Sequence, residues 1–417
     1  MKKILFVLPF KPYPLSHGGA QAIYNGINVV KDSYQVYITY VKEEIQDDGN
    51  DLLKAFSNNV ELYPFFIPIQ KKNKKKTIKE KIINKVYILL KKILRYKEQN
   101  DTITLSSFDY KKKIDDDFFQ IDSNYVQHIN NIIEDKHIDI VQCEMLETVA
   151  ISLMLPKKVK KVFVHHEIGW VVKELLIKER QFEQKFYLKY SKLIEVALLN
   201  NFDCVITLSS TDKEKLKSAG VNVPIKTSFA VVNTECERLL PINEYNILSF
   251  IGPEINPPNV QGIKWFVKDI WPYLKDKDKS YKLQIIGNWS QYGINEILDG
   301  VDDVHFLGYV DDLSKVLKNS IMIVPIKAGS GIRMKILESS ILGIPCVTTT
   351  VGVEGIPFEN GVHCMIADDP KEFAKSILLL KKQELREKIR TNANSLVKEY
   401  YSIDAFKKNR LDVYKML

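Results

Sequence analysis

The stretch AGSGIRMKILESSILGIPCVTTTVGVEGI, residues Ala328 to Ile356, decides the fold of the C-terminal half. Gly329 and Gly331 follow an apolar strand and open a helical pattern whose first turn carries Arg333 and Lys335. Basic residues at a helix N-terminus oppose the helix dipole, which favours acids there. Free N–H groups at a helix start form an anion site, and glycine lets a phosphate approach the backbone. The stretch therefore predicts a strand, turn and helix that bind a ligand's phosphates, with both cations adding charge-assisted contacts.

Glu338 lies on the same predicted helix, which Gly343 and Pro345 end. Counted from the glycine turn it is two turns along, or about 10 Å at 1.5 Å per residue. A carboxylate can accept hydrogen bonds from two hydroxyls, and a diol beside a pyrophosphate is a nucleotide ribose. The spacing therefore predicts a nucleotide site with Glu338 on the ribose. The alternative is a capped surface helix on which Glu338 faces water.

The 417 residues are too many for one ordinary core, so two domains are expected. Almost continuously apolar runs alternate with helical patterns, as expected for buried parallel strands joined by right-handed crossovers. The predicted strands are KILFVLPF, YQVYITYV, VELYPFFIPI, IDIVQCEML, KVFVHHE and DCVITLS, then NILSFIG, KLQIIGN, VHFLGYV, IMIVPI, PCVTTT and CMIAD. They predict an α/β fold of two doubly wound halves, linked by VVNTECERLLPINEYN and followed by a helical tail from Asp369 to Leu417.

The composition indicates a soluble globular protein. Hydrophobic residues make up 45% of the chain, and no stretch approaches the roughly 18 apolar residues of a membrane span. The start, MKKILFVLPF, lacks the cleavage site of a signal peptide and is better interpreted as a buried strand. Five cysteines are scattered without metal-ligand spacing: Cys143, Cys204, Cys236, Cys346 and Cys364. They are expected to be reduced thiols of a cytoplasmic protein.

One segment carries the excess positive charge. The whole chain is +8, whereas Lys71 to Lys97 alone contains 12 Lys and Arg against the single acid Glu80. Its apolar residues recur at helical spacing: Ile78, Ile82, Ile83, Val86, Leu89, Leu90, Ile93 and Leu94. A basic amphipathic helix of this kind can bind an anionic membrane surface. The alternative is an ordinary domain helix, and sparse aromatic residues and the lack of a binding motif argue against nucleic acid.

The second half resembles glycosyltransferase family 4, whose members are retaining enzymes of the GT-B fold. The resemblance rests on four ordered motifs: FIGPEINPPNVQGIKWFVKDIWPYL, VHFLGYVDDL, GSGIRMKILESSILGIPCVTTTVGVEGI and GVHCMIADDPKEFAKSI. It implies two Rossmann-like domains that face a cleft: an acceptor domain over residues 1–240, with the basic insertion 71–97, and a nucleotide-sugar domain over 241–397. Residues 398–417 are then a helix that returns to the first domain. The resemblance implies no metal and no cofactor, because the helix dipole and the cations do the work of a divalent ion.

The resemblance also assigns the donor site. Gly308 lies in the motif similar to the family's base-binding strand and loop, and Arg333 and Lys335 are assigned to the leaving phosphates. The nucleotide-sugar contacts are carried over to Gly329, Ser330, Gly331, Ile332 and Glu338. Two departures stand out. Many members have a glutamate eight positions before Glu338, where this chain has Ser330, and many have a cation in the loop PEINPPNVQG, where none precedes Lys264.

The first half contributes two further candidates. SHGGAQ, Ser16 to Gln21, follows the first strand, and the family places such a glycine pair against the donor phosphates, which assigns Gly18, Gly19 and Ala20. The strand VFVHHEIGW ends with His165 and His166, and the family often places a histidine there beside the transferred sugar. Strand alternation predicts that one of the two points inward and the other toward the site. A structural role for either, or a plain helix cap at SHGGAQ, is the alternative.

The sequence thus predicts a cytoplasmic, metal-independent glycosyltransferase, peripheral on the inner face of the membrane if the basic segment binds lipid. Its partners would be a nucleotide sugar and a glycan or lipid-linked acceptor, with no nucleic acid. A degenerate homologue that binds nucleotide or serves as a scaffold is the main alternative, and an epimerase or phosphorylase on the same fold is another. A dinucleotide dehydrogenase is disfavoured because HGGAQAIYNG is not G-x-G-x-x-G.

Overall fold

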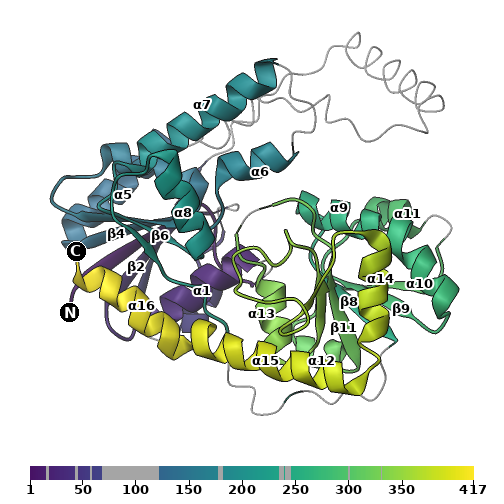
Figure 1. The fold of residues 1–417 in the computed structure, drawn as a ribbon. Coiled ribbons are helices and arrows are strands. Elements are labelled where there is room, and N and C mark those ends of the chain that lie inside the picture. The colour runs from purple at the N-terminus through teal and green to yellow at the C-terminus, as the bar shows by residue number, and fades with distance from the viewer. Residues whose placement is uncertain are drawn as a thin grey trace, which may run out of the picture.

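The computed structural model describes residues 1–15, 18–42, 46–56, 59–67, 122–176, 182–233, 239, 246–298, 301–329 and 331–417. Ser330, His17, Cys236 and the segment 71–97 lie outside the described residues. The chain forms two α/β halves, each built on a parallel sheet, as the apolar runs predicted (Figure 1).

The first half contains a seven-stranded sheet in the order β3-β2-β1-β4-β5-β6-β7. Its strands are β1 (Lys3–Leu8), β2 (Gln35–Lys42), β3 (Val60–Phe66), β4 (Ile140–Glu144), β5 (Lys160–His165), β6 (Cys204–Thr207) and β7 (Ile225–Thr227). Only β7 was not predicted, because three partly buried residues carry no periodic signal.

Helices cover both faces of this sheet (Figure 1). They are α1 (Gly18–Val30), α2 (Asn50–Phe56), α5 (Ser123–Lys136), the 3-10 helix η1 (Leu146–Met154), α6 (Gly169–Leu176), α7 (Phe182–Leu199) and α8 (Ser210–Ala219). Successive residues of β1 alternate between two cores: Leu5 and Val7 pack with α5, and Ile4 and Phe6 pack with α1.

The second half contains a six-stranded sheet in the order β10-β9-β8-β11-β12-β13. Its strands are β8 (Ile247–Ile251), β9 (Lys282–Ile286), β10 (Val304–Gly308), β11 (Ser320–Val324), β12 (Cys346–Thr348) and β13 (Met365–Ile366). Its helices are α9 (Pro257–Trp265), the π-helix η2 (Phe266–Ile270), α10 (Trp271–Lys277), α11 (Gln291–Leu298), α12 (Leu313–Leu317), α13 (Met334–Ile341) and α14 (Pro370–Leu379). In such open sheets ligands bind beyond the carboxyl ends of the strands.

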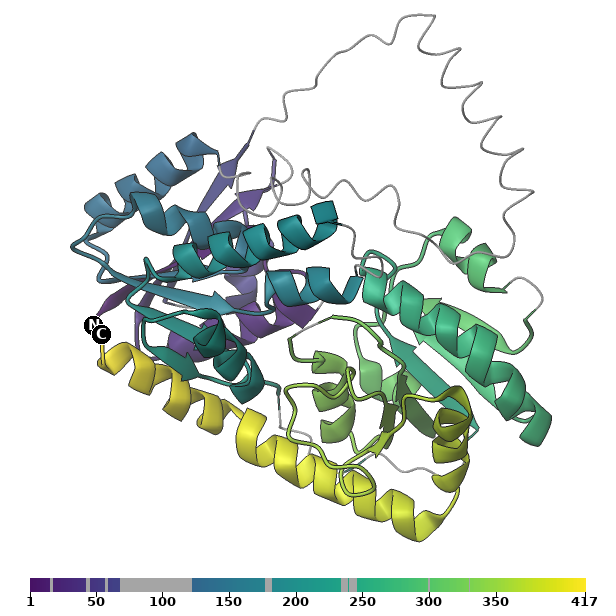
Figure 2. The same ribbon diagram turned by 45° about the horizontal axis from the view of Figure 1, so that its top comes forward.

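Two C-terminal helices connect the halves. α15 (Gln383–Tyr401) belongs to the core of the second half, whereas α16 (Ile403–Lys415) packs Phe406, Val413 and Tyr414 into the first. Figures 1 and 2 show this yellow pair running from one half to the other and ending beside the N-terminus. The break falls at Ser402, whose hydroxyl caps α16, rather than at residue 398.

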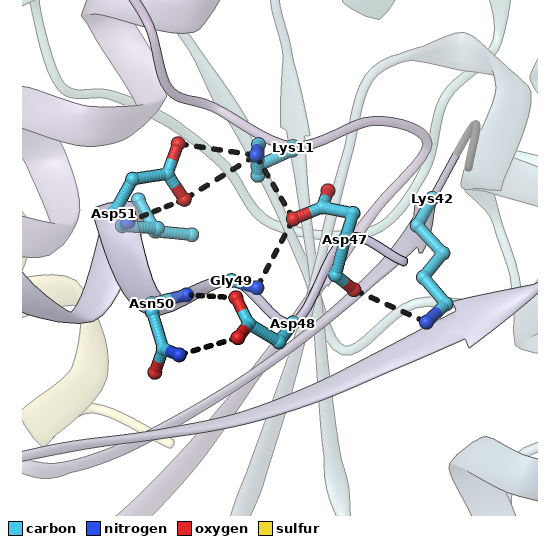
Figure 3. A network of polar contacts seen from close by, with 8 residues as sticks. Lys11, Lys42, Asp47, Asp48, Gly49, Asn50 and Asp51 are labelled. Atoms are coloured by element: carbon cyan, nitrogen blue, oxygen red, sulfur yellow. Dashed lines mark hydrogen bonds and ion pairs between the residues drawn. The ribbon is translucent and has the colours of Figure 1, made fainter. Parts of the chain in front are cut away.

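A polar network holds the segment between β1 and α1 (Figure 3). The Lys11 ammonium donates to Asp47 at 3.0 Å and to Asp51 at 3.1 Å. Lys42 donates to the carbonyl of Asp47 at 3.1 Å. The network ties the start of α2 to the chain that leads into the glycine pair at Gly18.

Four cysteines, Cys143, Cys204, Cys346 and Cys364, are buried free thiols. None of the helices within the described ranges has the length and apolar character needed to cross a membrane.

Candidate functional site

The glycine turn leads from β11 to α13. Gly329 and Gly331 have φ values of 123° and 79°, a left-handed region that favours glycine. α13 begins at Met334, so Arg333 is its N-cap residue. Arg333 therefore lies just before the first helical turn and not within it, where the sequence had predicted it. Glu338 is consequently four residues into the helix, about 6 Å at 1.5 Å per residue, and not two turns. The side chain of its N-cap residue, Arg333, makes no capping hydrogen bond. The Ile336 N–H donates to the Arg333 carbonyl at 2.8 Å, and N–H groups at a helix start can bind an anion.

Arg333 lies where the two halves meet. Its guanidinium donates to the Gly331 carbonyl at 2.6 Å and so braces the turn. Burial lowers the pKa of Arg333, and the carboxylates of Glu167, Glu354 and Asp212 act against that shift. Because Glu167 and Asp212 belong to the first half, this cation of the second half lies in an electrostatic environment that both halves create.

Lys335 turns toward the end of β8. Its ammonium donates to Asn259 Oδ1 at 2.9 Å and lies 4.4 Å from the ring centroid of Phe250. Burial and, to a lesser extent, neighbouring Arg333 lower the pKa of Lys335 to about 7, while Glu338 opposes the shift. Such a group changes charge readily when a ligand arrives.

Asn259 is a site residue that the sequence did not single out. It lies in the first turn of α9, is 5% exposed, and donates to the Pro253 carbonyl at 3.0 Å while accepting from Lys335. The segment after β8 therefore supplies no cation of its own. It instead binds the ammonium of Lys335, which follows β11, through Asn259. The sequence signal that could have indicated Asn259 is its place at the start of a helix that follows a strand.

Glu338 does not face open water. Burial raises the pKa of Glu338 to about 7, against the effects of Lys335 and of a hydrogen bond from Gln21. Gln21 belongs to α1, so a residue of the first half reaches the carboxylate. Figure 1 shows α1 and α13 meeting at the junction of the halves.

Close backbone contacts join the halves around the turn. A methyl group at position 331 would lie 2.4 Å from the carbonyl oxygen of His166, and one at position 18 would lie 3.3 Å from Met334. Ile332 packs against the cores of both halves. The structure thus brings Gly18, at the start of α1, and the end of β5 to the glycine turn.

The two histidines have different surroundings. His165 is 2% exposed and contacts Glu195 at 2.8 Å, and Glu195 also accepts from the N–H groups of Gly169 and Trp170. It is a core residue. His166 lies at the strand end next to Gly331, and its Nε2 is 2.6 Å from Glu144. Of the two candidates, only His166 is brought to the junction.

The remaining candidate residues, Gly19, Ala20 and Gly308, could contribute only backbone groups to a site. Ala20 is 1% exposed, so its methyl group is packed in the interior, and Gly19 lies in the first turn of α1. Gly308 ends β10 with φ 71° and accepts from the Gly287 N–H at 2.8 Å, and nothing lies within 4 Å of where a methyl group would stand. Gly308 therefore leaves room at the carboxyl edge of the sheet.

Part of the second half matches a known protein family, and one relative is similar over nearly the whole chain. Residues 245–383 match the family model described as glycosyl transferases group 1. A relative, an uncharacterized 44.6 kDa protein in the cps region of Klebsiella pneumoniae, is 24% identical over 96% of this chain and 97% of that protein.

Three solved structures have the same fold. Anabaena HepE in complex with UDP and glucose is 13% identical, with a TM-score of 0.67 over the full length of both chains. Sucrose-phosphate synthase from Thermosynechococcus elongatus is 12% identical, with a TM-score of 0.71 over 100% of this chain and 99% of that one. An S. aureus TarM variant with fondaparinux, alpha-GlcNAc-glycerol and UDP is 13% identical, with a TM-score of 0.67 over 99% of both. The architecture of two Rossmann-like domains is therefore the GT-B fold.

Proposed function

We propose that this protein is a retaining, metal-independent hexosyltransferase that uses a nucleotide diphosphate sugar to glycosylate a glycan or a lipid-linked acceptor. The observation that carries the proposal is the meeting of an uncapped helix start, Arg333 and Lys335 with the end of β5 at His166. The family match over residues 245–383 supports it. The relative in the cps region supports a role in bacterial surface polysaccharide synthesis.

In the proposed reaction the donor diphosphate lies at the N-terminus of α13, between Arg333 and Lys335. The bond from the anomeric carbon to the phosphate oxygen breaks while the acceptor oxygen bonds to that carbon on the same face. The acceptor proton passes to the departing phosphate. Because negative charge develops on the leaving group, cations and N–H groups aimed there stabilise the transition state more than the ground state. His166 would orient the sugar, and Glu338 would bind the ribose.

The alternative is a degenerate homologue that binds nucleotide without turnover, which Ser330 in place of the family's glutamate favours. Calorimetric titration with UDP and GDP tests for a site, and a screen of nucleotide sugars for turnover separates an enzyme from a binder. Transfer or slow hydrolysis with retention at the anomeric carbon supports the proposal. Tight nucleotide binding without turnover of any sugar supports the alternative.

Glu338→Ala is expected to weaken donor binding by about 1.5–3 kcal/mol, the range for hydrogen bonds to a charged group. The expected cause is the lost contact to the ribose hydroxyls, so the loss should vanish for a dideoxyribose diphosphate, which the parent is itself expected to bind weakly. Gln21→Ala removes the other partner of Glu338 and is the control that should keep the preference for ribose. Equal losses of ribose and dideoxyribose ligands in Glu338→Ala would rule out the ribose contact.

The proposed acceptor is lipid-linked, and α7 offers a surface for the membrane. Phe182, Phe186, Tyr190 and Leu193 recur every three or four residues and are 86%, 55%, 39% and 68% exposed. The rings of Phe186 and Tyr190 stack with centroids 6.0 Å apart. Such a stripe exposes apolar surface that a soluble monomer normally buries.

The charge along α7 identifies the partner. The exposed residues Lys185, Lys189 and Lys192 fall on one flank of the stripe at 100° per residue. An apolar face beside a lysine flank is complementary to an anionic bilayer, where acyl chains lie below negative headgroups. We propose that α7 and the basic segment 71–97 together place this protein on the inner face of the cell membrane.

We expect replacement of Phe182 and Phe186 by serine to reduce flotation on phosphatidylglycerol vesicles, because the apolar anchor is removed. Replacing Lys71, Lys72, Lys74, Lys75 and Lys76 by glutamine should reduce flotation further and weaken its salt dependence. Leu153→Ser with Met154→Ser changes exposed apolar residues of η1 and should have little effect. If the parent does not float, or if the α7 variant instead converts a dimer to a monomer in light scattering, the membrane proposal is wrong.

A further inference from the structure

Two polar residues are buried on an apolar face of the first sheet. Gln142 and Glu144 are two residues apart on β4 and therefore point to the same side, where α1 and α16 pack. They are 0% and 3% exposed. Polar groups in such a place destabilise the fold unless they are hydrogen-bonded, so their partners indicate why they are there.

The partners form one chain of hydrogen bonds. The Tyr414 hydroxyl on α16 donates to Gln142 Oε1 at 2.5 Å, and Gln142 Nε2 donates to Glu144 Oε1 at 2.5 Å. The other oxygen of Glu144 lies 2.6 Å from Nε2 of His166. Because a carboxylate only accepts, the amide must present its N–H to Glu144 and its oxygen to α16, so the tyrosine hydroxyl is the donor there. From Tyr414 to His166, each hydrogen bond of the chain therefore pairs one donor with one acceptor.

The chain fixes the proton on His166. A carboxylate accepts hydrogen bonds, so Glu144 holds the hydrogen on Nε2 and leaves Nδ1 as the atom of the neutral ring that can accept. The carbonyl of His166 is the group packed against Gly331. Ring orientation and tautomer are thus set next to the glycine turn of the other half.

We propose that Tyr414, Gln142 and Glu144 are positioning residues that set the tautomer and orientation of His166, so that the last helix of the chain controls a residue at the catalytic junction. The effect on turnover rests on the proposed function, whereas the effect on the imidazole does not. Hydrogen bonds in a buried network strengthen one another. Removing the Tyr414 hydroxyl, at the far end of the chain, should therefore weaken the hydrogen bond between Glu144 and His166.

Nitrogen-15 NMR of the His166 ring tests the chain directly. The parent should show the Nε2–H tautomer, and Glu144→Gln and Tyr414→Phe should each raise the Nδ1–H fraction. Tyr401→Phe is the matched control on α15, because the Tyr401 hydroxyl is buried and makes no hydrogen bond with any described residue. A mixture of tautomers in the parent, or unchanged ring shifts in Tyr414→Phe, overturns the proposal. Gln142→Met replaces Tyr414→Phe should that variant not fold.

Kinetics give the second readout. Tyr414→Phe is expected to lower kcat about two- to tenfold, the effect of one net hydrogen bond, with KM for the donor unchanged. The double variant with Glu144→Gln should lose less than the product of the two single losses. Fully multiplicative losses contradict the chain. Absence of turnover in the parent overturns the proposed function but leaves the NMR result to decide the chain.

Discussion

Gly331→Ala is expected to force the two halves apart and to lower turnover by about tenfold or more, since a loss of about 1.4 kcal/mol of transition-state stabilisation is already tenfold. The left-handed conformation alone would cost the alanine about 1–2 kcal/mol of stability, and the clash between the halves adds to that cost. The added methyl group would lie 2.4 Å from the His166 carbonyl oxygen. The methyl group is fixed to the Cα of residue 331 and the carbonyl is part of the backbone of His166, so neither can rotate away. The variant must move the turn, the end of β5, or both, and each movement separates the proposed diphosphate site from His166.

Gly361→Ala is the control that separates the effect of backbone strain from the effect of the contact with the His166 carbonyl. Gly361 has a φ of 70°, close to the 79° of Gly331, but nothing lies within 4 Å of where its methyl group would stand. Its alanine variant should lose thermal stability and keep its activity. Turnover and the radius of gyration from X-ray scattering measure the two effects. If the two variants lose turnover equally, the close contact between the halves does not matter for catalysis.

Lys335→Met is expected to weaken binding of a nucleoside diphosphate by about 1.5–3 kcal/mol and to leave nucleoside binding unchanged. The pKa of Lys335 is lowered to about 7 by burial, so at pH 8 most of the free protein carries a neutral amine. A diphosphate beside it favours the ammonium and raises its pKa. Binding at pH 8 should therefore take up protons, and the uptake should shrink below pH 6, where Lys335 is already charged.

Calorimetric titrations in buffers of different ionisation enthalpy measure this proton uptake. Lys335→Arg is the matched variant, because its guanidinium stays charged: it should keep part of the diphosphate affinity while the uptake linked to Lys335 disappears. Glu338→Gln should retain uptake at pH 8. Parent binding without proton uptake, or equal losses of nucleoside and diphosphate in Lys335→Met, would show that Lys335 serves packing against Asn259 and Phe250.

Local patterns predicted much of the molecule. Apolar runs such as KILFVLPF predicted twelve of the strands in two doubly wound halves, because buried parallel strands differ from amphipathic helices in period and length. The glycine turn after β11 and the cations beside it were also readable, because glycine spacing and charge are properties of neighbouring residues. The start of α13 at Met334 was not, since helix ends depend on capping contacts.

Contacts between distant residues decided the rest. Strand alternation predicted that His165 and His166 point to opposite sides, but only their partners, Glu195 and Glu144, show which one reaches the junction. Tyr414 and Gln142 are 272 residues apart, and no local periodicity relates them. Gly331 was predicted to make room for a phosphate, and the structure adds the His166 carbonyl that leaves no room for a side chain. The sequence by itself determined which segments become strands and helices, because that depends on neighbours along the chain; the tertiary structure alone decided which polar groups meet, because burial between the halves brings them together from separate elements.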